Sequence, residues 1–429
     1  METAPKKFFY GWFIAGVCML LAMNSAGVAN VLGVFFPPLV NEYGWNAKQV
    51  SGIASCVTFG TLVASLLFGS VFSKKNTRTV VLIFGIVMSA AFAGMYFPKN
   101  LIGLYVLAFI GGIGTVGVGF VSMPVLITKW FDSKRSTALS IGSIGSSLAG
   151  LALVPLFTYT LYPPLALGSG NSFLIWGAVI FATVLISFLV IRDKPENINL
   201  KAYGHNSGDP QPEIKGSAAN RDIGFSSKDI FRMPEFYGVA VVVFILGLSL
   251  PGLLVQIVSH LLLVGYSKVV AASIVSLYCM CTIFGKLIMG ITVDKIGIAK
   301  TSALTMAIWG LAIICLYFAG AHVIFIYLFG VLTGLGTPVA SIAPPIWTSS
   351  MFGLKHYASN YSKIFFCFTI GLVVGPVMVG ALKDMTGSFH FPILVVAVLV
   401  FASVPFLLMV LKSAGKKLAA LTEVMADKK

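Results

Sequence analysis

Residues 101–128 read LIGLYVLAFIGGIGTVGVGFVSMPVLIT, an apolar run without a charged residue. A helix of about 20 apolar residues crosses the roughly 30 Å of hydrocarbon in a bilayer, so this run predicts a membrane-spanning helix. Eleven further apolar runs long enough to cross a membrane lie along the 429-residue chain. The predicted spans are residues 12–39, 49–73, 79–97, 101–128, 136–162, 172–191, 236–264, 269–293, 301–318, 322–349, 359–382 and 390–411.

The composition of the whole chain agrees with this prediction. Hydrophobic residues make up 58%, charged residues 10%, and the mean hydropathy is +0.95, values too apolar for a water-soluble protein. The first span is long, begins after residues 1–9 and is not followed by a small-residue cleavage site, so it is expected to be retained and not to be a signal peptide. A multi-pass membrane protein follows.

The net charge of +15 is distributed unevenly between the two sides of the predicted membrane. Of 29 basic residues, 23 lie on one side. The other six are Lys48, Lys99, Lys268 and Lys383 in the opposite loops, and Lys286 and Lys363 within spans. Because cytoplasmic loops carry an excess of Lys and Arg, both termini are predicted to be cytoplasmic. The membrane is predicted to be the cell (plasma or inner) membrane. The basic charge therefore predicts contact with membrane lipid and no nucleic-acid partner.

A repeat divides the chain into two halves. Residues 111–115 read GGIGT and residues 334–337 read GLGT, while Gly69 and Gly290 lie 221 residues apart in similar surroundings. Tandem six-helix units are the architecture of carriers that rock two bundles about a central site. We therefore expect an all-α membrane protein of twelve helices in two pseudo-repeats with a central cavity.

The domain boundaries follow from a polar stretch between the sixth and seventh spans. The predicted organisation is an N-terminal six-helix bundle (1–192), a cytoplasmic linker (193–234), a C-terminal six-helix bundle (235–412) and a cytoplasmic tail (413–429). The end of the linker, residues 226–234, predicts a short interfacial helix that Pro234 terminates.

The second half carries a short loop motif after its second span. Gly290, Asp294, Lys295 and Gly297 form the pattern Gly-x3-Asp-Lys-x-Gly. The pattern resembles the loop signature of the major facilitator superfamily, and the resemblance implies a cytoplasmic gate in which the Asp lies near a helix end and a basic cluster.

The first half departs from this signature. Gly69 remains, but Ser73 stands where the family has Asp and Asn76 where it has Gly. Lys134 and Arg135, which precede the fifth span, are the basic residues that we expect to join the gate.

A closer resemblance, to the monocarboxylate transporters and the oxalate:formate antiporters, extends over nearly the whole chain. The segments that carry it are YGW at 10–12, FFPP at 35–38, YGW at 43–45, WFDSKR at 130–135, FRMPEFY at 231–237 and HL at 260–261. The resemblance implies a secondary carrier for a small carboxylate anion, similar to lactate, pyruvate or formate, that works by proton symport or anion exchange. A monomer without a cofactor is expected.

Lys286 is the deepest charge in the predicted spans, because all 14 Asp and Glu residues lie in loops or at helix ends. It lies about seven residues, or roughly 10 Å, inside its helix. A lone ammonium there costs about 2.5–3.5 kcal/mol, so we expect it to face an aqueous cavity and an anion. The family has an arginine here that binds the substrate carboxylate, and the resemblance implies the same role for Lys286. The alternative is a lysine bonded to backbone carbonyls of a neighbouring helix.

Other polar residues in the spans are weaker candidates for substrate binding. Thr282 and Tyr278 share a helix stripe with Lys286, although Thr282 could instead bond its own backbone. His260 could relay protons or be an interfacial histidine, and the proton carrier could be His260 or Lys286. Asn30 and Ser122 lie on helices that line the cavity in this fold. Lys363, one turn into its helix, favours snorkelling to the cytoplasm.

Several functional classes have no motif in this sequence. A phosphate-binding loop, a nucleophilic triad and a metal-ligand cluster are all missing, so neither an enzyme nor a metal site is expected. All six cysteines fall within predicted spans and predict reduced thiols. The alternatives left open are an exchanger of oxalate-type or larger organic anions, a transporter-like sensor and a drug exporter.

Overall fold

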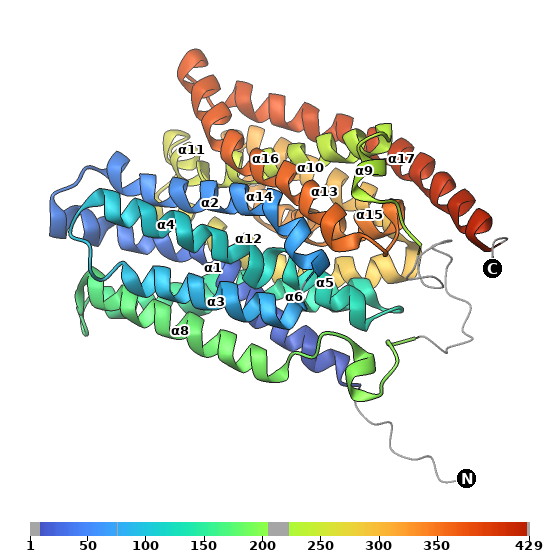
Figure 1. Cartoon of the computed structure of the whole chain (residues 1–429). Coiled ribbons are helices and arrows are strands. Elements are labelled where there is room, and N and C mark those ends of the chain that lie inside the picture. The colour runs from blue at the N-terminus through green and yellow to red at the C-terminus, as the bar shows by residue number, and fades with distance from the viewer. Residues whose placement is uncertain (1–8, 75, 205–222, 427–429) are drawn as a thin grey trace, which may run out of the picture.

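The computed structural model describes residues 9–74, 76–204 and 223–426, and helices make up most of these ranges (Figure 1). Within them, twelve segments are long and apolar enough to cross a membrane, which confirms the predicted number of spans. The first half contains α1 (Gly11–Tyr43), α2 (Ala47–Lys74), α3 (Thr77–Gly94), α4 (Leu101–Thr115), η1 (Val116–Phe120), α5 (Ser122–Trp130), α6 (Arg135–Leu148), η2 (Ala149–Leu153), α7 (Val154–Leu161) and α8 (Gly168–Val190).

The second half follows a connection that includes η3 (Pro195–Ile198) and α9 (Ser227–Ile230). Its helices are α10 (Pro234–Leu254), α11 (Ile257–Leu263), α12 (Lys268–Ile296), α13 (Ile298–Tyr317), α14 (Val323–Gly336), α15 (Val339–Phe352), α16 (Tyr357–Thr386) and α17 (His390–Ala426). The end of the molecule where α8 ends and α10 begins is called the linker end here, and the opposite end the far end (Figure 1).

Two spans of the first half are interrupted by π-helical turns. The fourth span runs through α4, η1 and α5, and the fifth through α6, η2 and α7. Gly119 in η1 lies so close to α1 that a Cβ atom there would overlap the Ser25 hydroxyl and lie 2.7 Å from the Leu21 carbonyl oxygen. Glycine thus allows η1 and α1 to pack backbone to backbone.

The seventh span is shorter than the predicted 236–264, which is wrong beyond Leu254. α10 ends there, Val255 and Gln256 interrupt the helix, and α11 follows as a separate element. Pro251 lies in the last turn of α10 and has no amide hydrogen to donate back along the helix, which weakens that turn. His260 therefore lies on α11 and not at the end of the seventh span.

The twelfth span is longer than the predicted 390–411. α17 continues to Ala426, so most of the predicted tail 413–429 is helical, and residues 427–429 lie outside the described residues. The extension is bound to the start of α10, because Ser413 and Lys417 donate hydrogen bonds of 2.6 and 2.8 Å to the two Glu235 carboxylate oxygens.

The connection between the halves is described only at its two ends, because residues 205–222 of the predicted linker 193–234 lie outside the described residues. The predicted short helix is present as α9, and its N-cap Ser226 and Asp229 bond each other's backbone amides in a capping box. Both described ends pair with loops. Tyr203 bridges to Phe131, and Gly224 to Gly353.

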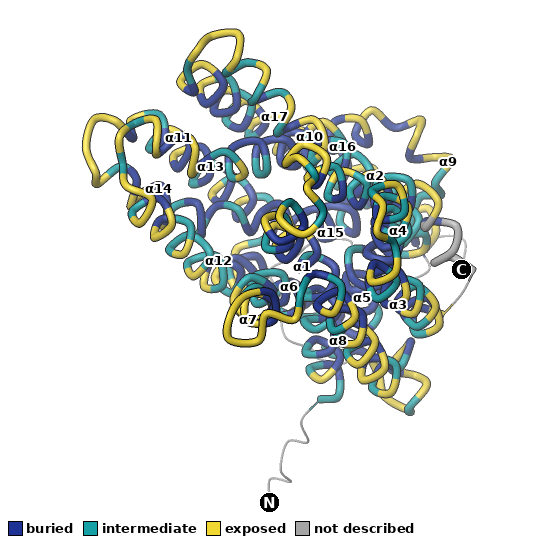
Figure 2. Tube along the Cα trace, turned by 90° about the vertical axis from the view of Figure 1, so that its left-hand side faces the viewer, coloured by how far each residue is buried: buried dark blue, intermediate teal, exposed yellow. Residues whose placement is uncertain are grey.

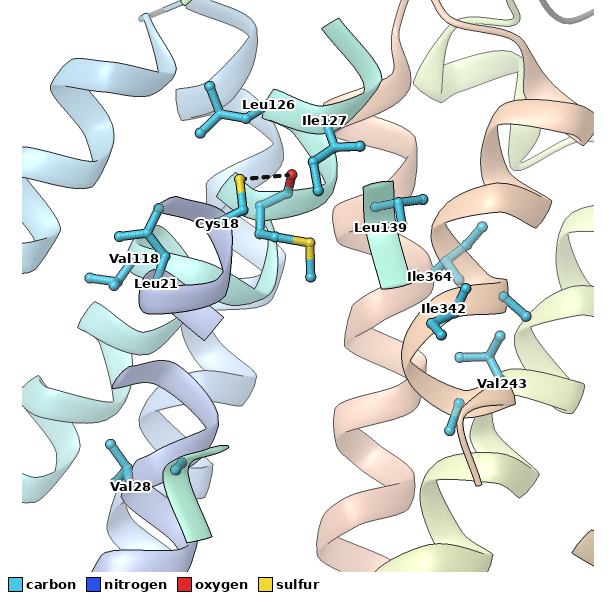
Figure 3. Close-up of a cluster of buried hydrophobic side chains, with 14 of the residues drawn as sticks. Cys18, Leu21, Val28, Val118, Leu126, Ile127, Leu139, Val243, Ile342 and Ile364 are labelled. Carbon is cyan, nitrogen blue, oxygen red and sulfur yellow. Dashed lines mark hydrogen bonds between the residues drawn. The ribbon is translucent and has the colours of Figure 1, made fainter. Parts of the chain in front are cut away.

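Buried apolar side chains connect the two halves. One buried cluster extends from α1 and α5 through Leu139 of α6 to α10, α15 and α16, and Figure 3 shows part of it. All six cysteines are free thiols; Cys18 is fully buried in this cluster, with its sulfur 4.0 Å from the Met123 carbonyl oxygen, and the other five are partly exposed.

Candidate functional site

The halves meet along two related helix pairs, α6 with α12 and α2 with α16 (Figure 2). Gly290 of α12 lies against α6, where a Cβ atom would overlap the Ser140 hydroxyl and lie 2.7 Å from the Ser136 carbonyl oxygen. Gly69 of α2, 221 residues earlier, lies against α16, where a Cβ atom would be 3.2 Å from Ser359. The repeat seen in the sequence therefore positions both helix contacts.

Lys286 lies two turns before Asp294 on α12 and is 3% exposed. Its ammonium donates three hydrogen bonds to α6 of the other half: to the Ser143 carbonyl oxygen at 2.8 Å, the Ser146 hydroxyl at 2.6 Å and the Ser147 hydroxyl at 2.9 Å. All three acceptors are neutral. The ammonium therefore has its full set of bonding partners but no compensating charge among them.

The expectation that Lys286 faces open water is wrong for this conformation. The structure shows the alternative, a lysine bonded to a neighbouring helix, with two hydroxyls added to the carbonyl. An ammonium inside a membrane must keep its three donors bonded, and α6 replaces water in doing so. Lys286 takes no part in the ion pairs Lys129–Asp193, Lys383–Asp384 and Lys417–Glu235 of the described residues.

The serines of α6 are functional candidates that reasoning from the sequence missed. Ser136, Ser140, Ser143 and Ser147 recur at spacings of four, three and four residues, which places them on one helix face. That polar stripe in an otherwise apolar span was a readable signal.

Thr282 and Tyr278 lie on α12, one and two turns from Lys286. The Thr282 hydroxyl donates a 2.6 Å hydrogen bond to the Tyr278 carbonyl oxygen, so the alternative of a bond to its own helix is confirmed. Tyr278 and Thr282 are both partly exposed.

Asn30 and Ser122 are placed differently from each other. Asn30 on α1 is exposed, whereas Ser122 at the start of α5 is fully buried and donates to the Gly117 carbonyl oxygen of η1. The hydroxyl of Ser122 therefore satisfies the backbone where η1 departs from α-helical geometry.

His260 lies at the far end, away from the contact between α6 and α12. It is 4% exposed, and its Nε2 is 3.4 Å from the Leu316 carbonyl oxygen. The ring centroids of Phe389 and His390 lie 5.2 and 6.4 Å away. The structure thus surrounds His260 with second-half residues and does not bring it to the Lys286 hydrogen bonds.

Asp294 of the loop motif binds the first half directly. Its carboxylate accepts hydrogen bonds from the backbone amides of Ser136 and Thr137 at 3.3 and 3.0 Å, and from the Thr137 hydroxyl at 2.6 Å. These amides are at the N-terminus of α6, where the helix dipole favours a negative charge.

The other gate residues lie at two helix ends: Lys295 and Gly297 at the end of α12, and Lys134 and Arg135 at the start of α6. Gly297 joins α12 to α13 with a φ of +88°, a conformation that residues with side chains rarely adopt, and Lys295 is exposed. Arg135 donates to the Phe131 carbonyl oxygen at 3.1 Å, and the Lys134 ammonium lies 5.9 Å from the Tyr203 ring centroid. The side chain of Ser73, predicted to depart from the motif, lies outside the described residues.

Lys363 on α16 turns toward the linker end. Its ammonium donates to the carbonyl oxygen and the hydroxyl of Ser359, one turn earlier, at 3.2 and 3.1 Å. Unlike Lys286, Lys363 bonds its own helix and does not join the halves through these bonds.

Known proteins similar to this chain are transporters. The mouse (Mus musculus) monocarboxylate transporter 12 is 21% identical over 405 residues, which cover 90% of this chain and 82% of the relative. Monocarboxylate transporter 4 of Rattus norvegicus is 21% identical over 89% of this chain and 79% of the relative. An uncharacterized MFS-type transporter of Escherichia coli, YhjX, is 22% identical over 76% of this chain and 77% of the relative.

Solved structures of two transporters share the fold. FucP in the outward conformation superposes with a TM-score of 0.68 at 15% identity, over 94% of this chain and 99% of FucP. The proton:xylose symporter XylE superposes with a TM-score of 0.72 at 12% identity, over 92% and 95%. The family model of the Major Facilitator Superfamily matches residues 13–273 and 263–424. This multi-pass membrane chain, with its two six-helix halves, belongs to the Major Facilitator Superfamily.

Proposed function

We propose that this transporter carries small monocarboxylates such as lactate, pyruvate or formate, and that the Lys286 ammonium binds the carboxylate. The observation that carries the proposal is the charge of Lys286, which is buried between the halves and bonded only to the neutral acceptors of α6. A carboxylate supplies the missing negative charge and accepts the same ammonium protons. The names of the monocarboxylate transporter relatives support this choice of substrate.

The proposal favours a monoanion over a dianion. One ammonium, Lys286, lies in the contact between α6 and α12, whereas Lys363 bonds its own helix near the linker end. A lysine is a compact charge on a flexible chain, without the two-pronged fork of arginine, so it tolerates carboxylates that differ in size and orientation. We expect formate, lactate and pyruvate to bind more tightly than oxalate.

The transport mode and orientation belong to the same proposal. Transport proceeds by alternating access, as proton symport or anion exchange, with Lys286 or His260 as the proton carrier. The excess of basic residues on one side supports cytoplasmic termini in a plasma or inner membrane.

Thermal unfolding of the purified protein tests the site. Formate, lactate or pyruvate at 100 times its Kd stabilises the native protein by about 2.7 kcal/mol. Lys286→Gln should abolish this stabilisation, and Lys363→Gln, which removes one ammonium from another membrane helix, should retain it. Stabilisation of Lys286→Gln equal to that of the native protein, or a response to oxalate alone, would contradict the proposal.

Counterflow in proteoliposomes separates the two transport modes. Proton symport predicts that a pH gradient drives accumulation of labelled lactate. Anion exchange predicts uptake only when a carboxylate is present on the opposite side, with or without the gradient. Ligand-induced stabilisation without flux would identify a sensor, and efflux of lipophilic cations a drug exporter.

A further inference from the structure

Three residues on successive turns of α12 contact α6, and each of these three contacts is called a level here. On α12, Lys286, Gly290 and Asp294 are four residues apart and share one helix face. Asp294 binds the first turn of α6, Gly290 packs against Ser140, and Lys286 bonds the region of Ser143 to Ser147. Lys286 is thus the level farthest from the linker end and nearest the middle of the bundle.

The two charged levels bond the opposite half in different ways. Asp294 binds backbone amides at the helix start, where no other helical group competes for them. Lys286 binds one carbonyl and two side-chain hydroxyls in the middle of a span. A soluble anion can compete with these three acceptors for the Lys286 ammonium, because the ammonium has three donors and prefers a charged acceptor.

The related contact between α2 and α16 contains no such level at the corresponding position. Ser65, 221 residues before Lys286, is fully buried and its hydroxyl donates to the Leu62 carbonyl oxygen of its own helix at 2.7 Å. Tyr361 and Phe365 of α16 pack there in an apolar cluster with Ala64 of α2. A carboxylate that binds the Lys286 ammonium therefore acts on the contact between α6 and α12 and not on the contact between α2 and α16.

We propose that Lys286 acts as a latch between the halves in addition to binding the carboxylate. Its bonds to Ser143, Ser146 and Ser147 hold the linker end closed when the site is empty. This inference rests on the proposed carboxylate site. A bound carboxylate takes ammonium protons from these α6 acceptors, which weakens the contact between α6 and α12. A ligand shifts a conformational equilibrium by its difference in affinity between the two states, and here the anion binds best where Lys286 has left α6.

Hydrogen–deuterium exchange of the ligand-free protein tests the latch directly. The double variant S146A/S147A removes two acceptors and leaves Lys286 in place. Its amides in residues 136–143 and 290–296 should exchange at least about 100-fold faster than those of the native protein, because two charge-assisted hydrogen bonds are lost. Unchanged exchange in this variant would overturn the latch.

A matched control comes from α12 itself. Ser273 and Ser276 are exposed, and their hydroxyls donate to the carbonyl oxygens of Val270 and Ala272 on the same helix. S273A/S276A makes the same chemical change without touching α6 and should leave exchange at the linker end at the native rate. Thermal unfolding of both double variants checks that they are folded.

Lactate as the probe separates failure of the latch from failure of the substrate site. In the native protein, lactate should accelerate exchange in residues 136–143, whereas Lys286→Gln should exchange rapidly with or without lactate. If lactate stabilises the native protein but slows this exchange, the latch is overturned and the carboxylate site stands. If formate, lactate and pyruvate all fail to stabilise the protein, the proposed substrate class is wrong, and the ligand-free comparison still decides whether Lys286 holds the contact.

Discussion

Among single residues, Lys286 was identifiable from the sequence because charge inside an apolar span is costly and rare. That Ser146 and Ser147 bond Lys286 could not be predicted, because helical periodicity indicates which face a residue occupies and not which helix lies opposite. Thr282 illustrates the same limit. Its position beside Lys286 allowed a role in binding, but its hydroxyl bonds the Tyr278 carbonyl oxygen one turn away.

Gly290 permits a close approach of the two halves, which leads to a prediction for Gly290→Ala. A Cβ atom would overlap the Ser140 hydroxyl and lie 2.7 Å from the Ser136 carbonyl oxygen. Overpacking of this kind costs about 1–3 kcal/mol. We expect a lower unfolding temperature and faster amide exchange at the start of α6. Gly16→Ala on α1 is the control, because no atom lies within 4 Å of its added Cβ. If the two variants were equally stable, the halves could accommodate the added methyl group without loss of stability, which would contradict the prediction.

Among elements, a buried ion pair joins three helices at the linker end. Asp193, just after α8, accepts bonds from the Lys129 ammonium of α5 at 2.8 Å and from the Thr77 amide at the start of α3 at 2.7 Å. Burial raises the pKa of the Asp193 carboxyl, but the Lys129 ammonium and the Thr77 hydrogen bonds outweigh burial and hold it below its ordinary value. The carboxylate therefore stabilises the fold wherever it is ionised.

Asp193→Asn tests this ion pair through its pH dependence. A lowered native pKa gives a stability contribution that is complete above the unfolded value of about 4 and is lost as the pH falls through the native value. At pH 7 the variant should lose about 2 kcal/mol, and the difference from the native protein should shrink only as the pH falls below about 4, toward the lowered native pKa. Thermal unfolding between pH 3 and 7 measures both.

The control for this experiment is an exposed pair with the same chemistry. Asp384 lies 3.4 Å from Lys383, and its side chain is 77% exposed. Asp384→Asn should change the free energy of unfolding by less than about 0.5 kcal/mol at any of these pH values. A loss from Asp384→Asn as large as that from Asp193→Asn would contradict the view that burial gives the pair its value.

At the scale of the whole molecule, the predicted cytoplasmic position of both termini is open to a direct measurement. Lys99 is exposed at the far end, and Lys300 is exposed at the linker end on α13. In a background without the six native cysteines, Lys99→Cys on intact cells should react with a membrane-impermeant maleimide. Lys300→Cys should react only after the membrane is permeabilised. The reverse pattern would place the linker end outside.

The sequence alone determined the twelve spans and the two related halves, and it predicted the orientation and singled out Lys286 as a candidate. Hydropathy, charge distribution and repeats are properties of the chain itself, and the membrane acts on each span separately. The seventh span shows where this reasoning weakens, because the position of its break depends on how the turn after Pro251 packs.

The tertiary structure decided what Lys286 touches. The hydrogen bonds from Lys286 to Ser143, Ser146 and Ser147 join residues that are about 140 positions apart and belong to different halves. Such a contact depends on which helices pack together and at what depth, and neither follows from the periodicity of a single helix. The packing of α6 on α12 places the Lys286 ammonium, which was predicted to face water, in hydrogen bonds between the two halves.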